Sequence, residues 1–109
     1  MAWKVEWTEK AWNDLEIVAD YIARDSPYYA AALVREVRDA ARSLAFFANR
    51  GRKVPEFEAI SLRELLVGNY RLIYQVSEKK VFVVAFIHGA RDLASLDSSH
   101  LSSPNNENS

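Results

Sequence analysis

Four side chains in the second half of the sequence could bind a phosphodiester and move a proton. They are Arg63, Arg71, His88 and Arg91. Guanidinium groups present rigid forks of N–H donors that suit phosphate oxygens, and histidine can both accept and donate a proton near neutral pH. Adjacent strands lie about 5 Å apart, so Arg71 and His88 would approach each other if the register of two neighbouring strands allows it. One hypothesis is therefore phosphodiester chemistry without a metal ion.

The same residues also have structural interpretations. Arg71 could form a salt bridge to Glu64 across a hairpin, because strand arginines are commonly solvated or paired. His88, at the end of an expected strand, could act only as a local hydrogen-bonding group. Arg91 and Asp92 could form an exposed pair that follows the last strand. Both sets of interpretations stay open at the level of sequence.

Composition excludes several other kinds of site. Cysteine is absent, which rules out disulfides, thiolate nucleophiles and Cys-based zinc sites. The two histidines, His88 and His100, have no carboxylate cluster spaced like a metal shell, so we expect no metal and no other cofactor. The three glycines are isolated, so there is no glycine-rich phosphate loop, and a serine nucleophile elbow is also missing.

Charge and hydropathy narrow the classes further. The formal net charge of -1 argues against a protein whose whole surface attracts nucleic acid. Residues 35–53 nevertheless hold six basic and two acidic residues. These charges form a local basic patch or pair with the acidic residues of a neighbouring helix. No apolar run approaches the roughly 20 residues of a membrane span and no leader follows Met1, so we expect a cytoplasmic protein with no membrane association.

The candidate residues need elements to position them, and the first two can be inferred from spacing. Residues 2–7 alternate apolar and charged side chains, which is typical of a half-buried strand. Thr8 is placed to cap a following helix, with Trp7 and Trp12 spaced as a hydrophobic staple. The apolar stripe of this helix is Ala11, Leu15, Val18 and Ile22, whereas Lys10, Asp14, Glu16 and Asp20 are left to water.

A second helix should follow after a tight connection. Ser26 offers a capping oxygen, and Pro27 suits a first helical turn, so the two helices are expected to be antiparallel neighbours. Gly51 is placed for a left-handed stop, and residues 50–60 lack a period and predict a loop. The predicted apolar stripe is Leu33, Val37, Ala40, Leu44 and Phe47, with Arg35, Arg38 and Arg42 on another side.

Three strands should form the rest of the domain. Residues 61–67 and 70–76 flank Gly68–Asn69, a dipeptide suited to a two-residue hairpin turn. Residues 77–80 form a second turn before 81–88, an apolar run typical of an interior strand. The parity of the middle strand also predicts that Tyr70 and Tyr74 are core residues.

This order predicts an α+β domain over residues 1–101. A helical hairpin packs on one face of a mostly antiparallel four-stranded sheet, with a short C-terminal helix or turn around Leu93, Leu96 and Leu101. Residues 102–109 should be a disordered polar tail. Because one face of such a sheet lacks a lid, apolar residues such as Leu65, Val67 and Ile73 are expected to be covered by a partner.

Three segments of the second half of the chain and one upstream helical segment form an ordered series of motifs. The three are Leu62-Arg63-Glu64-Leu65, Gly68-Asn69-Tyr70-Arg71-Leu72-Ile73-Tyr74 and His88-Gly89-Ala90-Arg91-Asp92; the upstream segment is Ala11-Trp12-Asn13-Asp14-Leu15 with Ile17, Tyr21 and Ile22. Together they resemble the RelE/ParE toxin superfamily of type II toxin–antitoxin systems. The resemblance runs from about Trp3 to Asp92. It implies a cognate antitoxin that wraps the toxin, a heterotetramer or larger complex, and a role in plasmid stabilisation.

The superfamily has two branches with different targets. ParE-like members inhibit DNA gyrase by protein–protein binding, and RelE-like members cut messenger RNA on the ribosome without a metal. The long helical hairpin, the His-Gly-x-Arg-Asp ending and the near-neutral charge favour the ParE-like branch. The binding surface it implies comprises Arg63, Leu65, Val67, Arg71, Ile73, His88, Arg91 and Asp92.

Two alternatives are carried forward. A RelE-like nuclease would use Arg71 and His88, supplemented by Arg63 and Arg91, although no tyrosine follows His88 where some nucleases place an aromatic group. An inactive scaffold would bind only the antitoxin.

Overall fold

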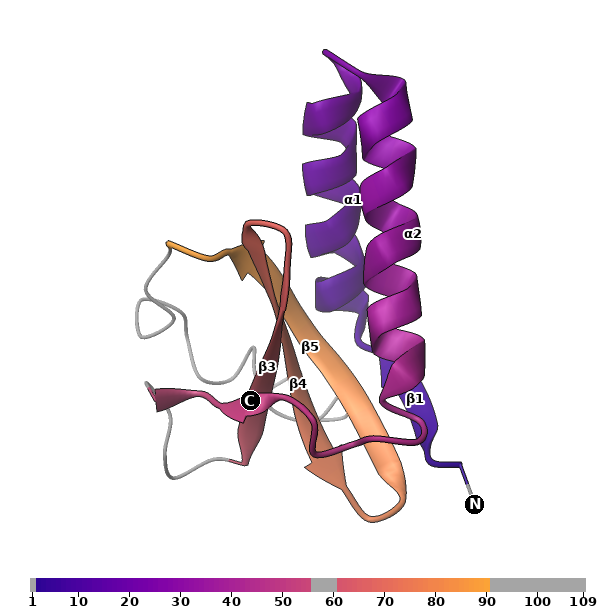
Figure 1. Cartoon of the computed structure of the whole chain (residues 1–109), viewed down its shortest axis with the longest axis vertical. Coiled ribbons are helices and arrows are strands. Elements are labelled where there is room, and N and C mark those ends of the chain that lie inside the picture. The colour runs from indigo at the N-terminus through magenta and orange to yellow at the C-terminus, as the bar shows by residue number, and fades with distance from the viewer. Residues whose placement is uncertain (1, 56–60, 91–109) are drawn as a thin grey trace.

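The computed structural model describes residues 2–55 and 61–90, and the elements below lie within these ranges. They are β1 (Lys4–Trp7), α1 (Glu9–Ala23), α2 (Pro27–Ser43), β2 (Arg52–Lys53), β3 (Leu62–Val67), β4 (Tyr70–Ser77) and β5 (Lys80–His88). The sheet has the order β1-β5-β4-β3-β2, in which β1 runs parallel to β5 and the other pairs are antiparallel. The helices stand side by side against one face of the sheet and extend beyond it (Figure 1). The predicted α+β fold with a helical hairpin on one sheet is confirmed.

Local capping sets the start of α1. The Thr8 hydroxyl accepts a hydrogen bond from Ala11 N–H over 3.1 Å. The rings of Trp7 and Trp12 meet edge to face, with centroids 5.4 Å apart, so both the cap and the staple are confirmed. The prediction that Asp14 is left to water is wrong, because its Oδ2 accepts from Phe86 N–H of β5 over 3.1 Å. Asp14 thereby ties α1 to the sheet.

Helix α2 also begins as predicted, but it ends earlier. The Ser26 hydroxyl accepts from Tyr29 N–H over 3.2 Å, and Pro27 opens the helix. The helix stops at Ser43, so Gly51 is not its C-terminal stop, and Phe47 is 64% exposed rather than part of the apolar stripe. Gly51 does not adopt a left-handed backbone conformation, because Gly68 alone among the described glycines has a positive φ.

The hairpin of β3 and β4 turns at Gly68, whose φ of 58° matches the predicted glycine-first turn. Strand β5 lies between β1 and β4, which confirms its interior position. A register shift between Ile73 and Tyr74 leaves Val84 as an extra residue on β5. This bulge reverses the facing of every later residue of β5.

The sheet has five strands rather than four. Residues 50–60 were expected to form a loop, but Arg52–Lys53 pairs with Glu64 and Arg63 as β2. Two residues are too few to produce an alternating pattern, so this strand leaves no periodic signal in the sequence.

Two apolar clusters lie on the two faces of the sheet. The cluster under the helices includes Ala11, Leu15, Val37, Leu44, Leu65, Val67, Leu72, Tyr74, Val83 and Phe86. The cluster on the other face comprises Val54, Leu62, Ile73, Val84, Ala85 and Ile87.

These clusters correct one prediction. Leu65 and Val67 do not face an open side of the sheet, because the parity of β3 places them under the helices. Ile73 does lie on the other face, but its side chain is fully buried in the chain itself.

Some predictions fall outside the described residues. These are the roles of Arg91 and Asp92, the C-terminal helix or turn, and the disordered tail 102–109. Within the described part of the chain, neither helix is long and apolar enough to span a membrane.

Candidate functional site

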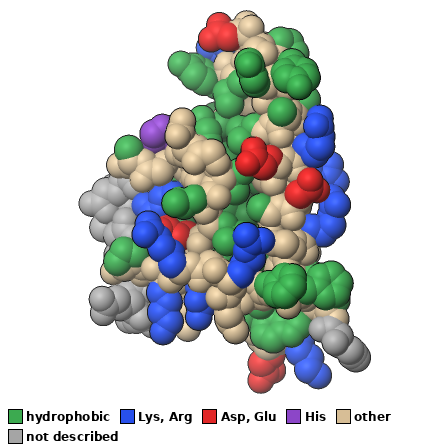
Figure 2. Space-filling model, viewed as in Figure 1, with side chains coloured by type: hydrophobic (Ala, Val, Ile, Leu, Met, Phe, Trp, Pro, Cys, Tyr) green, Lys and Arg blue, Asp and Glu red, His purple; other side chains and the backbone are tan. Residues whose placement is uncertain are grey.

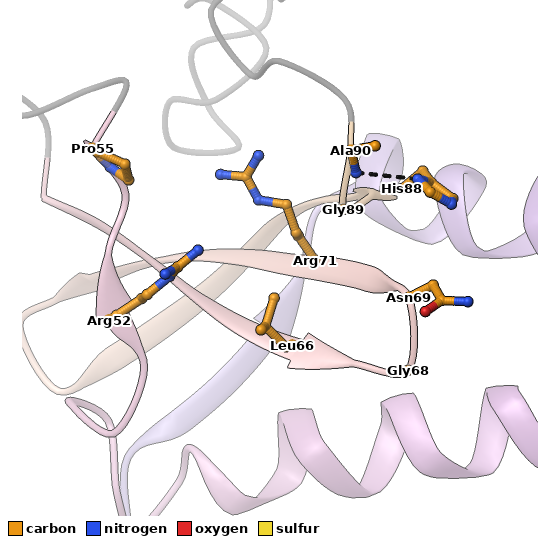
Figure 3. A pocket seen from close by; sticks show the side chains of 9 residues that line it. All are labelled: Arg52, Pro55, Leu66, Gly68, Asn69, Arg71, His88, Gly89 and Ala90. Carbon is orange, nitrogen blue, oxygen red and sulfur yellow. Dashed lines mark hydrogen bonds between the residues drawn. The ribbon is translucent and has the colours of Figure 1, made fainter.

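A pocket of about 550 Å³ lies at the end of the sheet where β3 turns into β4 and β5 ends. Its lining residues are Arg52, Pro55, Leu66, Gly68, Asn69, Arg71, His88, Gly89 and Ala90 (Figure 3). Two of the predicted site residues, Arg71 and His88, therefore contribute to the same pocket. Leu66 is 64% exposed, so the wall includes an accessible apolar side chain.

A buried carboxylate holds the two arginines of this pocket. Glu64 Oε1 accepts from Arg71 Nε over 2.6 Å, and Glu64 Oε2 accepts from Arg52 Nε. Glu64 and Arg71 are both buried, whereas the Arg52 side chain is 68% exposed. A buried carboxylate is costly unless it is paired. The Arg71–Glu64 pair confirms the predicted salt bridge across the hairpin, and the same carboxylate also binds Arg52.

His88 lies on the other side of the sheet from the Arg71 guanidinium. Its ring contacts the ring of Tyr70 edge to face, with centroids 5.5 Å apart, and its Nδ1 accepts from Ala90 N–H over 3.1 Å. Tyr70 packs against the cluster under the helices, and Arg71, the next residue, faces the opposite way. Figure 3 shows the His88 ring directed away from Arg71. The structure thus brings the two residues to one pocket without making their side chains converge.

Arg63 is placed in a different polar group, under the helix side of the sheet. Its guanidinium donates to the carbonyl of Gly51 over 2.7 Å and to that of Asn49 over 3.3 Å. The Tyr74 hydroxyl accepts from Gly51 N–H over 2.9 Å. A Cβ on Gly51 would lie only 2.5 Å from the Glu64 carbonyl oxygen and 2.6 Å from the Tyr74 hydroxyl, so only glycine fits. These contacts fasten the segment before β2 to the sheet.

Tyr74 has a perturbed acidity. Burial raises its pKa above the ordinary 10.0, although the Gly51 hydrogen bond and the positive charges of Arg63 and Arg50 oppose this effect. The hydroxyl is therefore neutral at physiological pH and serves as an acceptor for backbone.

Several site residues were not singled out in the sequence. Arg52, Leu66 and Asn69 line the pocket, and Glu64 was considered only as a partner for Arg71. Glu64 did leave a signal, because a charged residue beside Leu62 and Leu65 in an apolar strand needs a cationic partner if it is buried. Arg52 left none, since its position depends on a two-residue strand.

The helical hairpin exposes a set of large apolar side chains. They are Trp12, Ile17, Tyr21, Tyr28 and Tyr29 on the hairpin, and Phe46 and Phe47 just after α2, with exposed fractions from 40% to 75%. Figure 2 shows hydrophobic side chains gathered at the far end of the hairpin and at the other end of α2. Exposed aromatic groups of this kind are typical of protein-binding surfaces.

Comparisons with known proteins agree with this architecture. Residues 5–93 match the model of the family described as ParE toxin of type II toxin-antitoxin system, parDE. Toxin RelE2 of Caulobacter vibrioides is 37% identical over 89 residues, which cover 81% of this chain and 97% of that protein.

Two solved structures have a similar fold. The chromosomal ParDE toxin–antitoxin system from P. aeruginosa has a TM-score of 0.67 at 23% identity, covering 80% of this chain and 96% of the other. The toxin–antitoxin complex RelBE2 from Mycobacterium tuberculosis has a TM-score of 0.56 at 23% identity, covering 81% and 99%.

The fold and these similarities define the class of protein as a RelE/ParE superfamily toxin of a type II toxin–antitoxin system. Within that superfamily, the chain belongs to the ParE toxin family.

Proposed function

We propose that the chain inhibits DNA gyrase by binding it as a protein partner, and that a cognate antitoxin neutralises it in the cytoplasm. The observation that carries this proposal is the division of the candidate residues between two faces of the sheet. Arg71 pairs with buried Glu64 on one face, while Arg63 and His88 lie on the other. Groups that move a proton must lie within hydrogen-bonding reach of the same reacting atoms, and this arrangement does not favour that.

The exposed aromatic side chains of the helical hairpin support binding to a protein partner. Tyr21, Tyr28 and Tyr29 flank the connection between α1 and α2, and each is at least two-thirds exposed. This end of the hairpin extends beyond the sheet (Figure 1). Tyrosine is enriched among the residues that dominate binding energy at protein interfaces. A toxin that acts by docking on an enzyme needs such a surface, whereas a nuclease needs a convergent polar site.

A gyrase supercoiling assay tests the proposal. Purified chain should inhibit supercoiling in proportion to its concentration, and Tyr28→Ala with Tyr29→Ala should weaken inhibition by about tenfold or more because it removes exposed anchors. Tyr21→Ala should have a smaller effect, and all variants should keep the wild-type unfolding midpoint since these side chains are exposed. Full gyrase activity at a large excess of toxin would contradict the proposal.

A RelE-like messenger RNA endonuclease is the second candidate. It is favoured by the similarity to Toxin RelE2 and by a pocket that Arg52, Arg71 and His88 line together. Ribosome-dependent cleavage that survives EDTA and is lost in His88→Ala would support it. This variant is informative because His88 is exposed, so its loss should leave the fold intact.

The third candidate is an inactive scaffold that only binds an antitoxin. Expression of the chain without the antitoxin discriminates it from both toxins. Growth arrest supports an active toxin, and normal growth with soluble protein present supports the scaffold. Purification with the product of the adjoining open reading frame, followed by mass measurement of the complex, tests the antitoxin and the proposed heterotetramer or larger assembly.

A further inference from the structure

The outer edge of β1 is open beside α2. Strand β1 lies at one end of the sheet and pairs with β5 alone. Lys4 N–H donates to the Lys79 carbonyl over 3.2 Å, which directs the backbone groups of Lys4 toward β5. Backbone groups alternate in direction along a strand, so the N–H groups of Val5 and Trp7 point to the outer edge. Neither has a backbone partner within the described residues.

The first donor of this outer row shows what the edge can bind. Trp3 N–H points the same way as Val5 and Trp7, and it donates to the carbonyl of Ala45 over 2.7 Å. The segment that follows α2 therefore pairs with this edge once and then leaves it. The next two donors of the row continue in the geometry that an added strand requires.

A groove lies next to these donors. It has a volume of about 200 Å³ and is lined by Val5 and Trp7 of β1 and by Arg38, Ala41 and Arg42 of α2. Half-buried Val5 and Trp7 and buried Ala41 form its apolar part. The groove is therefore walled on one side by an open strand edge and on the other by two guanidinium groups.

The arginines of α2 form few interactions with the described residues. Arg42 pairs with Asp39 over 3.4 Å, but both side chains are more than 60% exposed, at 69% and 61%. Arg35 and Arg38 make no ion pair or side-chain hydrogen bond with the described residues. Basic side chains gather along the outer side of α2 in Figure 2. The predicted pairing of these charges with acidic residues of α1 is not found among the described residues.

We propose that an extended, acidic segment of the antitoxin occupies this groove, adds a strand to the outer edge of β1 and places a carboxylate between Arg38 and Arg42. The proposal rests on the proposed function, because the antitoxin is the occupant. The N–H donors along a strand edge can bind the carbonyl groups of another extended chain, and two neighbouring guanidinium groups favour a carboxylate. A nucleic acid would use the arginines but not the backbone donors, so the two features together favour a peptide.

Amide hydrogen exchange on the complex with the product of the adjoining open reading frame tests the strand addition. Exchange at Val5 and Trp7 should slow by at least about tenfold on binding, because both amides gain hydrogen bonds. Lys4 should be protected in the free chain and in the complex. A complex that leaves Val5 and Trp7 unprotected overturns this inference but not the proposed neutralisation by an antitoxin. Failure to form any complex overturns both.

Charge reversal tests the carboxylate. Arg38→Glu with Arg42→Glu should weaken antitoxin binding at least about tenfold, since like charges would then meet across the groove. Arg24→Glu with Lys53→Glu is the matched control, as it changes the net charge equally at the hairpin end of α1 and on β2, the opposite edge strand. The control should stay within about twofold. Equal losses in the two variants would show a general charge effect and overturn the proposed carboxylate contact.

Proline tests the backbone contact separately. Val5→Pro removes an outward N–H, which an edge strand tolerates, and should weaken binding about tenfold. Val5→Ala shortens the same side chain but keeps the N–H, so it should lose clearly less affinity. Similar affinities for the two variants would contradict strand addition.

Discussion

Polar groups on both faces of the β3–β4 hairpin form hydrogen bonds inside the fold, whereas those beside β1 stay open to solvent. Glu64 holds Arg71 and Arg52, and the Tyr74 hydroxyl holds Gly51 N–H. At the other edge of the sheet, outward N–H groups of β1 face exposed arginines of α2. Because a buried charge without a partner is costly, the first region must be complete before any partner binds. The second region can stay incomplete because water satisfies it.

This contrast predicts that the two regions respond differently to mutation. Substitutions among the polar groups of the β3–β4 hairpin should lower the free energy of unfolding, and substitutions beside β1 should weaken antitoxin binding.

Arg71→Ala should lower the free energy of unfolding by about 3–5 kcal/mol, since it removes the buried partner of a buried carboxylate. Urea unfolding monitored by circular dichroism measures the change. Arg52→Ala is the matched control, because this arginine pairs with the same Glu64 but is 68% exposed, and should cost under about 1 kcal/mol. Equal losses of unfolding free energy in the two variants would show that burial of the arginine does not decide its contribution to stability.

Gly51→Ala should lower the free energy of unfolding by about 2–3 kcal/mol, because the added methyl group overlaps two buried oxygen atoms. Gly68→Ala separates this crowding from backbone strain. Gly68 has a positive φ, but an added Cβ there meets nothing within 4 Å, so about 1 kcal/mol is expected. A larger loss for Gly68→Ala in the same urea unfolding assay would contradict the close approach at Gly51.

Tyr74→Phe should cost about 1 kcal/mol at neutral pH, because Gly51 N–H loses its acceptor. Its effect should also depend on pH. Burial raises the pKa of Tyr74 in the folded chain above 10.0, so the folded state holds this proton more tightly than the unfolded state. The resulting contribution to stability is full below pH 10 and is lost as the pH rises through the folded pKa.

Unfolding of Tyr74→Phe between pH 8 and pH 11 checks that linkage. The wild-type protein should lose stability more steeply than Tyr74→Phe above about pH 10. Parallel pH profiles for the two proteins would argue against a raised pKa at Tyr74.

Arg38→Ala with Arg42→Ala should change the free energy of unfolding by less than about 0.5 kcal/mol, since both side chains are exposed and only a weak ion pair is lost. The same variant should bind the antitoxin measurably more weakly, as titration calorimetry would show. A large loss of stability would show that these arginines stabilise the fold as the buried Arg71–Glu64 pair does, which would contradict the contrast between the two regions.

Local features were predictable because they depend on near neighbours in the chain. Thr8 and Ser26 cap the helices that follow them, and the Gly68 turn joins two strands that meet directly after it. Each of these features is decided within about four residues, which is the range over which backbone capping and turn chemistry act.

Features that join distant segments were not predictable in the same way. Asp14 was assigned to solvent from its position on α1, but it accepts from Phe86, which lies 72 residues later. Gly51 was assigned to a helix end, but Glu64 and Tyr74 set its role. No pattern within a single segment reports the approach of another segment.

The order of the elements, their caps and turns, and the resemblance to a toxin superfamily could all be inferred from the amino-acid sequence. Which functional groups share a face of the sheet became clear only from the folded chain. The bulge at Val84 turns His88 to the helix side of the sheet, although strict alternation from Val83 would have placed it on the face of Arg71. The physical reason is that strands alternate every two residues, so one extra residue, which sequence periodicity does not reveal, exchanges the faces of all residues after it.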